Sequence, residues 1–257
     1  MNYVIGIDIG TRTSKAVVIG DGGRVIVRHI LNSGYDYSSI AIRLRDEVLR
    51  IADLDLHDIS SIVATGHGSK KISFSNTRKA DILCCAKGIT SSCPRVRTVV
   101  DIQRTYTQVI RFDESGKIKN YAISEKCATG CGCFLEIISN VLRVGEEELG
   151  PLSMNCETPL NFSTGCAVFG ESEVISRVSE GFRKEDIIGG VHKSIASKIL
   201  NLLNRVGIEK ECAVCGGGAL NMGLIKCMEQ TLDCELLIPS DPQFINALGA
   251  ALMAEAN

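Results

Sequence analysis

The feature of this sequence that most limits its possible folds is a strand–turn–strand pattern that occurs twice. In the first copy an apolar strand ends near Asp8, and a second one, Ser14–Val17, follows a tight turn. In the second copy Asp101 holds the equivalent position and Thr107–Ile110 follows it. Third strands are expected at Arg24–Ile30 and Ile118–Ile123. The simplest interpretation is a duplicated three-strand unit, giving two lobes that face each other across a cleft with both aspartates directed into it. The alternative is a chance similarity between two apolar hairpins.

The rest of the chain predicts a mixed α/β fold. Short strands are expected at Ser61–Thr65, Cys212–Cys215 and Glu235–Ile238. Helices are expected at Ser38–Ala52, Asp81–Gly88, Phe134–Val144, Glu171–Glu180, Lys184–Val206, Leu220–Leu232 and Gln243–Glu255. We expect residues 1–97 to form the first lobe, completed by a C-terminal helix in 243–257, and residues 98–242 to form the second.

Composition excludes several classes of protein. With 28 Lys and Arg against 30 Asp and Glu, the chain has no basic field to hold a nucleic-acid backbone. No apolar run approaches the roughly 18 residues of a membrane span, and no basic-then-apolar leader begins the chain. These observations predict a cytoplasmic protein with no nucleic-acid or membrane partner. Its 12 cysteines then indicate metal, cluster or redox chemistry, or simply small buried side chains.

The first hairpin carries residues suited to a phosphate. Gly10 permits a tight turn whose backbone amides can approach a phosphate group, and Asp8 is placed to hold water on a Mg²⁺ ion. Hydroxyl donors and one cation complete the segment, at Thr11, Thr13, Ser14 and Lys15. Any hairpin can carry Asp and Gly, so this motif alone is a weak indication.

A glycine run between a predicted strand and a predicted helix gives a stronger indication. Gly216, Gly217 and Gly218 would let the backbone meet a ligand at the helix N-terminus, with Asn221 close by. The alternative is a glycine-rich connector without a ligand. The run is neither a Rossmann nor a P-loop motif.

Together these segments resemble a known family over essentially the whole chain. The family comprises the ATP-dependent activators of 2-hydroxyacyl-CoA dehydratases and the related benzoyl-CoA reductase ATPase subunits, within the acetate kinase, sugar kinase, Hsp70 and actin superfamily. The most specific motifs are Lys126-Cys127-Ala128-Thr129-Gly130 and Cys166-Ala167-Val168-Phe169-Gly170-Glu171-Ser172-Glu173. The resemblance implies a two-lobed actin/Hsp70-like ATPase fold that binds Mg-ATP or Mg-ADP. In such a fold the two hairpins would hold the phosphates and the Gly216-Gly217 turn would hold the adenosine. It also implies that Asp8 and Asp101 are catalytic.

Two cysteines stand out because each precedes a predicted helix. Cys127 and Cys166 would lie near helix N-termini, where unpaired amides favour a thiolate. The resemblance implies that both bind a 4Fe–4S cluster. Because such a cluster needs four thiolates, a second subunit would supply the other pair, with one cluster per homodimer or paralogous heterodimer. Without the resemblance, two small buried cysteines are the simpler interpretation.

The other cysteines are expected to be small buried side chains. Cys212 and Cys215 have the spacing of a redox or zinc motif, but they lie in a predicted strand without a second pair. Cys131 and Cys133 stand where the activators usually have a Thr and an Arg, and either could enter the cluster environment or form a redox pair.

The second hairpin departs from the family pattern. The activators have Asp-Ile-Gly-Gly-Gln-Asp where this chain has Asp101-Ile102-Gln103-Arg104-Thr105-Tyr106. Side chains at Gln103 and Arg104 would crowd the approach of a γ-phosphate, although Arg104 could contribute positive charge there. This departure predicts weak or absent ATP hydrolysis by the isolated chain.

The resemblance implies a function in ATP-dependent electron transfer. The dimer would pass single electrons from a ferredoxin or flavodoxin to a dehydratase or aryl-CoA reductase component, with lobe closure around ATP changing the angle between the cluster-bearing helices. One alternative is a non-hydrolysing paralogue that pairs with an active subunit. Another is a small-metabolite kinase of the same superfamily. This alternative is disfavoured because the chain is short for such a kinase and because a kinase would have no use for the cysteine-bearing helices.

Overall fold

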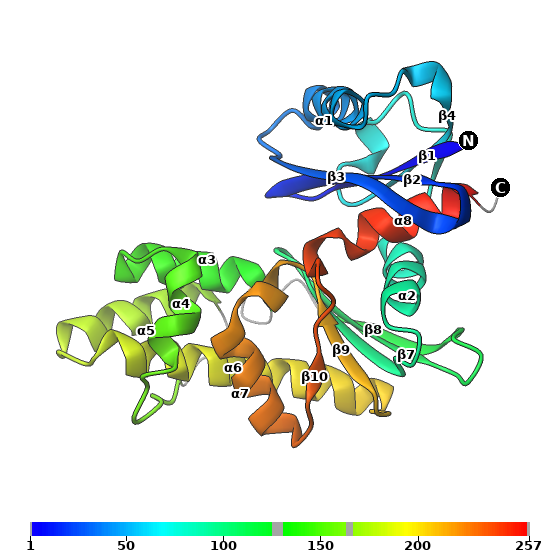
Figure 1. The fold of residues 1–257 in the computed structure, drawn as a ribbon. Helices are drawn as coiled ribbons and strands as arrows, with labels where there is room; N and C mark the ends of the chain where they lie inside the picture. Colours follow the sequence, from blue (N-terminus) through cyan, green and yellow to red (C-terminus); the bar gives the residue numbers. More distant parts are fainter. Residues whose placement is uncertain (1, 125–130, 163–166, 256–257) are drawn as a thin grey trace. The chain divides into compact units, whose positions relative to one another are not determined.

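The computed structural model describes residues 2–124, 131–162 and 167–255. The chain divides into two compact units (Figure 1). Unit 1 comprises Met1–Pro94 and Gln243–Asn257, and unit 2 comprises Arg95–Pro242. No helix among the described residues is long and apolar enough to cross a membrane.

The sheet of unit 1 has five strands in the order β3-β2-β1-β4-β5. They are β1 (Tyr3–Ile9), β2 (Thr13–Gly20), β3 (Arg24–Asn32), β4 (Ile59–Thr65) and β5 (Thr77–Arg78). β1 pairs antiparallel with β2 and parallel with β4. Because both faces of the sheet are covered, nearly every residue of β1 and β2 is buried, and these strands are almost continuous apolar runs.

Helices cover both faces of this sheet. Alternate residues of β1 and β2 pack against α1 (Tyr37–Ala52) on one face and against α2 (Asp81–Ser92) and α8 (Ile245–Glu255) on the other, as Figure 1 shows. α1 begins where the carboxylate of Asp36 accepts hydrogen bonds from the Ser38 and Ser39 amides, an N-cap arrangement. Three short 3₁₀ turns complete the unit: η1 (Asp21–Gly23), η2 (Leu56–Asp58) and η3 (Ser69–Lys71).

The packing of α8 on α2 requires glycine at two positions. A Cβ atom at Gly249 would overlap the carbonyl oxygen of Cys84, and one at Gly88 would overlap the carbonyl oxygen of Ile245. The backbones of the two helices therefore approach more closely than side chains would allow. This contact fixes the C-terminal helix beneath strands from the start of the chain.

Unit 2 contains a sheet with the same topology. Its strands are β6 (Thr98–Ile102), β7 (Thr107–Phe112), β8 (Ile118–Ile123), β9 (Cys212–Cys215) and β10 (Leu236–Leu237), in the order β10-β9-β6-β7-β8. β6 pairs antiparallel with β7 and parallel with β9, as β1 pairs with β2 and β4.

The register of the two sheets confirms the predicted duplication. Asp8 lies opposite Lys15 on β2, and Asp101 lies opposite Gln108 on β7. On the parallel side the two aspartates pair with the last residues of β4 and β9. The similarity extends to five strands rather than three, which excludes a chance similarity between two hairpins.

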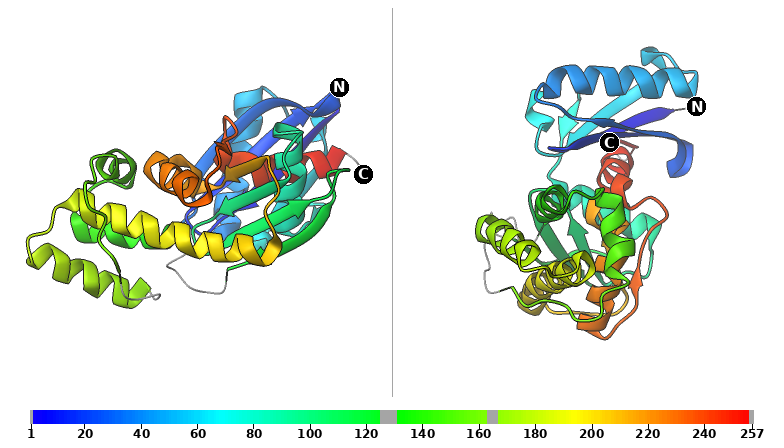
Figure 2. Two further views of the ribbon diagram at one scale, coloured as in Figure 1. Left: turned by 90° about the horizontal axis from the view of Figure 1, so that it is seen from below. Right: turned by 90° about the vertical axis from the view of Figure 1, so that its left-hand side faces the viewer.

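The helices of unit 2 pack around one large core. They are α3 (Gly132–Leu142), α4 (Glu146–Ser153), α5 (Ala167–Ser179), α6 (Lys184–Val206) and α7 (Met222–Leu232). α6 runs along one face of the sheet, as Figure 2 shows, and buries apolar side chains along its whole length against β6–β8 and the other helices.

Several elements differ from the sequence expectations. α2 continues to Ser92 instead of ending at Gly88, α5 begins at Ala167 instead of Glu171, and β5 was not expected. α4 was not expected; it is short and contains Pro151. The 3₁₀ turn η5 (Gly217–Leu220) precedes α7, so this helix begins later than predicted because Asn221 caps it. A further 3₁₀ turn, η6 (Pro242–Phe244), likewise precedes α8.

Candidate functional site

The first hairpin presents a buried ion pair beside its turn. Asp8, near the end of β1, is only 4% exposed. The Nζ atom of Lys15 lies 4.0 Å from Asp8 Oδ2 and donates to the Thr13 carbonyl oxygen at 3.3 Å. Lys15 thus balances the carboxylate charge and also holds the start of β2. Thr11, Thr13 and Gly10 are half-buried at the same turn.

Ser14 contributes to the internal bonding of this turn. Its hydroxyl lies 2.8 Å from the hydroxyl of Ser33, which donates to the Gly10 carbonyl oxygen at 2.7 Å. The Ser33 amide also donates to the Arg12 carbonyl oxygen at 2.8 Å. Ser33, which the sequence analysis did not single out, therefore fixes the shape of the turn. The predicted contact of Ser14 with a phosphate stays a prediction.

Asp8 is supported from the end of β4. Gly66 has a φ of +88°, and its backbone lies against the Asp8 carboxylate so closely that a Cβ atom would overlap Oδ1. The Gly66 amide and the Thr65 hydroxyl both donate to Asp81 Oδ1 at 2.6 Å. Asp81, in the first turn of α2, thus positions the segment that contacts Asp8. Sequence analysis missed this role because Asp81 showed only the ordinary signal of a helix start.

Cys84 lies beneath this arrangement. The pKa of its thiol is raised to about 12, mainly by burial and to a smaller extent by the carboxylates of Asp81 and Asp8. Cys84 is therefore a neutral structural thiol, as the sequence analysis expected for the scattered cysteines.

The second hairpin encloses its aspartate more completely. Asp101 is fully buried, and its two carboxylate oxygens accept hydrogen bonds from Gln103 Nε2 at 2.6 Å and Gln108 Nε2 at 2.8 Å. Gln108 was missed in the sequence, yet it is the repeat equivalent of Lys15, which is the signal that could have found it. A neutral amide thus replaces the cation of the first hairpin.

The glycine run lies directly against this aspartate. Gly216 has a φ of +82°, and a Cβ atom there would be 2.6 Å from Asp101 Oδ1 and would overlap the carbonyl oxygen of Ile102. Gly218 is packed equally closely against the Ile102 side chain, whereas Gly217 is exposed. Gly216 and Gly66 therefore occupy equivalent places in the two units, each at the end of the strand parallel to the aspartate strand.

The side chain of Asn221 is engaged within the protein. Its Oδ1 accepts from the Leu224 amide at 3.0 Å and caps α7, while its Nδ2 lies 3.1 Å from Nε2 of His192. Burial lowers the pKa of His192 to about 4, so the ring is neutral and its Nε2 can accept from the amide. Asn221 thus orients the segment that follows the glycine run, and its predicted role toward nucleotide stays a prediction.

The turn of the second hairpin is bonded to α3. The guanidinium of Arg104 contacts Glu136 Oε2 through Nε at 2.9 Å and Nη2 at 2.8 Å. The amides of Gly132 and Cys133 donate to the carbonyl oxygens of Gln103 and Arg104. Sequence analysis placed Arg104 near a phosphate and did not single out Glu136.

The two helices that follow the predicted cluster ligands contact each other through their first turns. Gly170 of α5 packs on the ring of Phe134 of α3, where a Cβ atom would lie 2.9 Å from the ring. Cys127 and Cys166 themselves lie outside the described residues. Cys131 is buried at the N-cap position of α3, and Cys133 is half-buried in its first turn.

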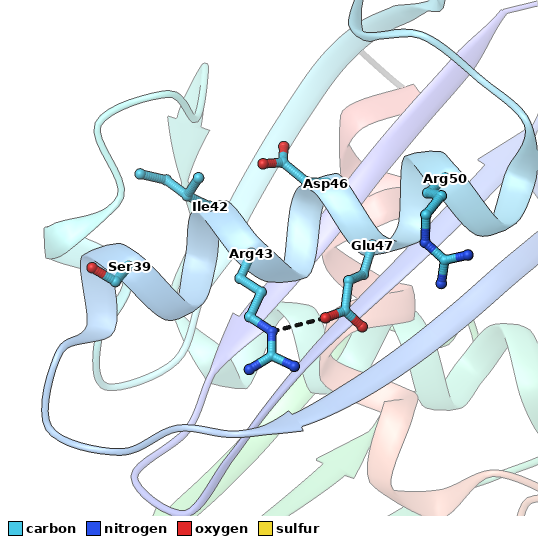
Figure 3. Close-up of a pocket in the computed structure, with 6 residues that line it drawn as sticks. All are labelled: Ser39, Ile42, Arg43, Asp46, Glu47 and Arg50. Atoms are coloured by element: carbon cyan, nitrogen blue, oxygen red, sulfur yellow. Dashed lines mark hydrogen bonds and ion pairs between the residues drawn. The ribbon is translucent and has the colours of Figure 1, made fainter.

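A separate hollow lies on the outward face of α1, as Figure 3 shows. There Arg43 Nε donates to Glu47 Oε1 at 2.8 Å, and His29 Nε2 contacts the other oxygen of Glu47 at 2.6 Å. The lining residues are Ser39, Ile42, Arg43, Asp46, Glu47 and Arg50. None belongs to either hairpin, so this hollow is not part of the predicted site.

Comparison with known proteins identifies the family. The model of the BadF/BadG/BcrA/BcrD ATPase family matches residues 5–254. This chain belongs to that family. Among its relatives, the activator of lactoyl-CoA dehydratase from Anaerotignum propionicum is 38% identical over 252 residues, covering 98% of this chain and 97% of the relative.

Solved structures agree with membership of the BadF/BadG/BcrA/BcrD family. The activator of 2-hydroxyisocaproyl-CoA dehydratase from Clostridium difficile, with bound ADPNP, is 34% identical with a TM-score of 0.93, covering 98% of this chain and 94% of that one. A ROK family glucokinase from Streptomyces griseus, 11% identical with a TM-score of 0.58 over 99% of this chain and 100% of its own, shares the fold alone. The predicted two-lobed actin/Hsp70-like ATPase fold is thereby confirmed.

Proposed function

We propose that this chain is an ATP-dependent one-electron activator of a 2-hydroxyacyl-CoA dehydratase or aryl-CoA reductase component. Its electrons would come from a ferredoxin or flavodoxin, and a 4Fe–4S cluster held jointly by two subunits would carry them. Cys127 and Cys166 of each subunit would be the ligands. The names of the relatives support the general activity, and the geometry of unit 2 supports the ligand assignment.

The contact between the first turns of α3 and α5 carries this proposal. Cys166 directly precedes α5 in the sequence, and Cys127 precedes α3 by five positions. Because Phe134 and Gly170 touch, the chain enters both helices within a small region. This contact supports the proposal that Cys127 and Cys166 bind one common cluster.

The donor set also fits a shared cluster. Thiolates are the usual ligands of a 4Fe–4S cluster, which needs four of them, and one subunit would supply two. A two-fold dimer would supply all four thiolates. When bound, the cluster would accept and release one electron at a time.

Nucleotide would bind through the two aspartate hairpins and the glycine run. Asp8 and Lys15 provide a carboxylate for a hydrated Mg²⁺ ion and a cation for a phosphate. The exposed Gly217 leaves backbone accessible for the adenosine. The bound ADPNP in the 34% identical activator structure supports a nucleotide of this kind.

One observation favours a second candidate function, that of a subunit that binds nucleotide without hydrolysing it. Both oxygens of Asp101 already accept hydrogen bonds from Gln103 and Gln108, and the guanidinium of Arg104 is held by Glu136. Asp101 is therefore poorly placed to act on a water molecule, and such a chain would pair with an active paralogue.

Iron analysis tests the cluster. Anaerobically purified protein should contain about four iron and four sulfide per dimer. Cys127→Ala and Cys166→Ala should each abolish the cluster, whereas Cys234→Ala, at a half-buried cysteine of the same unit, should retain it. A full cluster in either of the first two variants would refute the ligand assignment.

Thermal unfolding tests the nucleotide site. Mg-ADP should raise the Tm because a ligand that binds only the native state stabilises it. Gly217→Val should remove this rise, and Ser115→Val, at an exposed turn outside the site, should keep it. Hydrolysis is then measured with and without a partner subunit, because activity that appears only with the partner favours the second candidate.

A further inference from the structure

The turn of the second hairpin caps α3. The first N–H groups of any α-helix have no partner within the helix. In α3 the N-cap residue Cys131 makes no side-chain hydrogen bond to them. Instead, the Gly132 amide donates to the Gln103 carbonyl oxygen at 2.9 Å and the Cys133 amide donates to the Arg104 carbonyl oxygen at 2.8 Å. The hairpin backbone thus takes the place of a capping side chain.

One ion pair reinforces this backbone contact. Arg104 directs two nitrogens to a single oxygen of Glu136, which lies one turn further along α3. The two side chains are 35% and 27% exposed. On the other side of the turn, Gln103 is bonded to the buried Asp101. A continuous path of hydrogen bonds therefore runs from Asp101 through the turn to α3.

We propose that Arg104 is a positioning residue that fastens the second hairpin turn to α3, so that a displacement of the turn by nucleotide is transmitted to this helix. The inference rests on the proposed function, in which α3 follows the cluster ligand Cys127. It assigns Arg104 to Glu136 rather than to a phosphate.

The chemistry of the contact supports this assignment. A guanidinium directed at a carboxylate is already charge-balanced, so it offers less to an arriving phosphate than an unpaired one would. The two backbone hydrogen bonds from Gly132 and Cys133 join the same turn to α3, so the ion pair and the backbone contact act on one segment.

Hydrogen exchange followed by mass spectrometry tests the proposal on the full-length protein. Without nucleotide, Arg104→Ala should speed exchange in the first turn of α3 by up to about fivefold, the range expected for a partly exposed ion pair. With Mg-ATP or Mg-ADP, wild-type protein should show different exchange in this turn, and Arg104→Ala should lose that difference.

Two further variants separate coupling from general destabilisation. The exchanged pair Arg104→Glu with Glu136→Arg should restore both the slow exchange and the nucleotide difference. Arg97→Ala removes a comparable ion pair with Glu209, at 2.6 Å in the same unit, and should leave α3 unchanged.

Each outcome decides the assignment. Unchanged exchange in Arg104→Ala without nucleotide, or no restoration in the exchanged pair, would overturn the link to α3. Loss of the Mg-ADP-dependent rise in Tm in Arg104→Ala would instead show Arg104 to be a phosphate ligand. If nucleotide did not change the Tm of the wild-type protein, the proposed function would be contradicted. The comparison of wild type with Arg104→Ala without nucleotide would still test the link between the turn and α3.

Discussion

Substituting Gly216 should destabilise the protein for two separable reasons. Its φ of +82° and ψ of −178° lie in a region that essentially only glycine adopts, and the strain costs any other residue about 1–3 kcal/mol. In addition, a Cβ atom would lie 2.6 Å from Asp101 Oδ1 and overlap the Ile102 carbonyl oxygen, both of which are buried and held by the sheet. Forcing them apart should cost a further ~1–3 kcal/mol, as for overpacking elsewhere.

A second glycine with a positive φ gives a comparison in which no steric overlap occurs. Gly116, in the turn between β7 and β8, has a φ of +77° and nothing within 4 Å of its hypothetical Cβ atom. Gly116→Ala should therefore lower the free energy of unfolding by only about 1–2 kcal/mol. Gly216→Ala should lower it by about 2–6 kcal/mol, the sum of the two effects.

Urea unfolding followed by far-UV circular dichroism measures both values. The free energies should differ by at least about 1 kcal/mol, with Gly216→Ala the less stable. Equal losses in the two variants would refute the reasoning, because they would mean that the Gly216 backbone does not lie against Asp101. Gly216→Ala should also weaken the Mg-ADP-dependent rise in Tm, since a displaced Asp101 disturbs the hairpin.

Three other perturbations have defined outcomes. Gly88→Ala should lower the Tm sharply because its methyl group would overlap the Ile245 carbonyl oxygen, whereas Ser92→Ala on the same helix should change it little. Asp81→Ala should cost about 1–3 kcal/mol in urea unfolding because it removes the acceptor of the Gly66 amide, whereas the Thr65 hydroxyl can still donate to the Lys79 carbonyl oxygen. Asp81→Asn, which keeps an oxygen, should cost less. His192 should make the free energy of unfolding depend on pH, because its imidazole is protonated near pH 6.5 in the unfolded chain and only near pH 4 in the folded protein. Its contribution should be constant above pH 7 and should fall by about 3 kcal/mol on acidification to pH 4. In His192→Gln this part of the pH dependence should disappear; an unchanged pH profile would show that His192 is not the group responsible.

The fold was predictable largely because the strand–turn–strand pattern occurs twice in the sequence. The repeated apolar strands around Asp8 and Asp101 indicated the hairpins, and the same register in both sheets confirmed their equivalence. α4 was missed because it is short and contains Pro151, so it has no clear apolar periodicity. In the structure it is stabilised by three acidic residues at its N-terminus and by contacts with α6 and α7.

The places of the candidate residues in the hairpins were predictable, but their hydrogen-bond partners were not. Asp8, Lys15 and the glycine run could be recognised from their residue types, because the charge of a side chain and the backbone freedom of glycine depend only on the residue itself. The partners Asp81, Gln108 and Glu136 come from other strands and helices, and no local pattern marks them. Arg104 illustrates the difference, since the sequence shows only a cation in the turn after Asp101, and the fold shows that it contacts the Glu136 carboxylate.

The packing of α8 also constrains the order in which the two units can fold during translation. One face of the first sheet is covered by Ala247, Ala250, Ala251 and Ala254, which are translated after all of unit 2. At ordinary rates of synthesis of about 5–20 residues per second, roughly 10–30 s pass between the emergence of the two parts. During that interval the apolar face of β1 and β2 lacks the part of its cover that α8 provides, and it is open to chaperones or to aggregation. Unit 2 is continuous in sequence and can fold in the meantime.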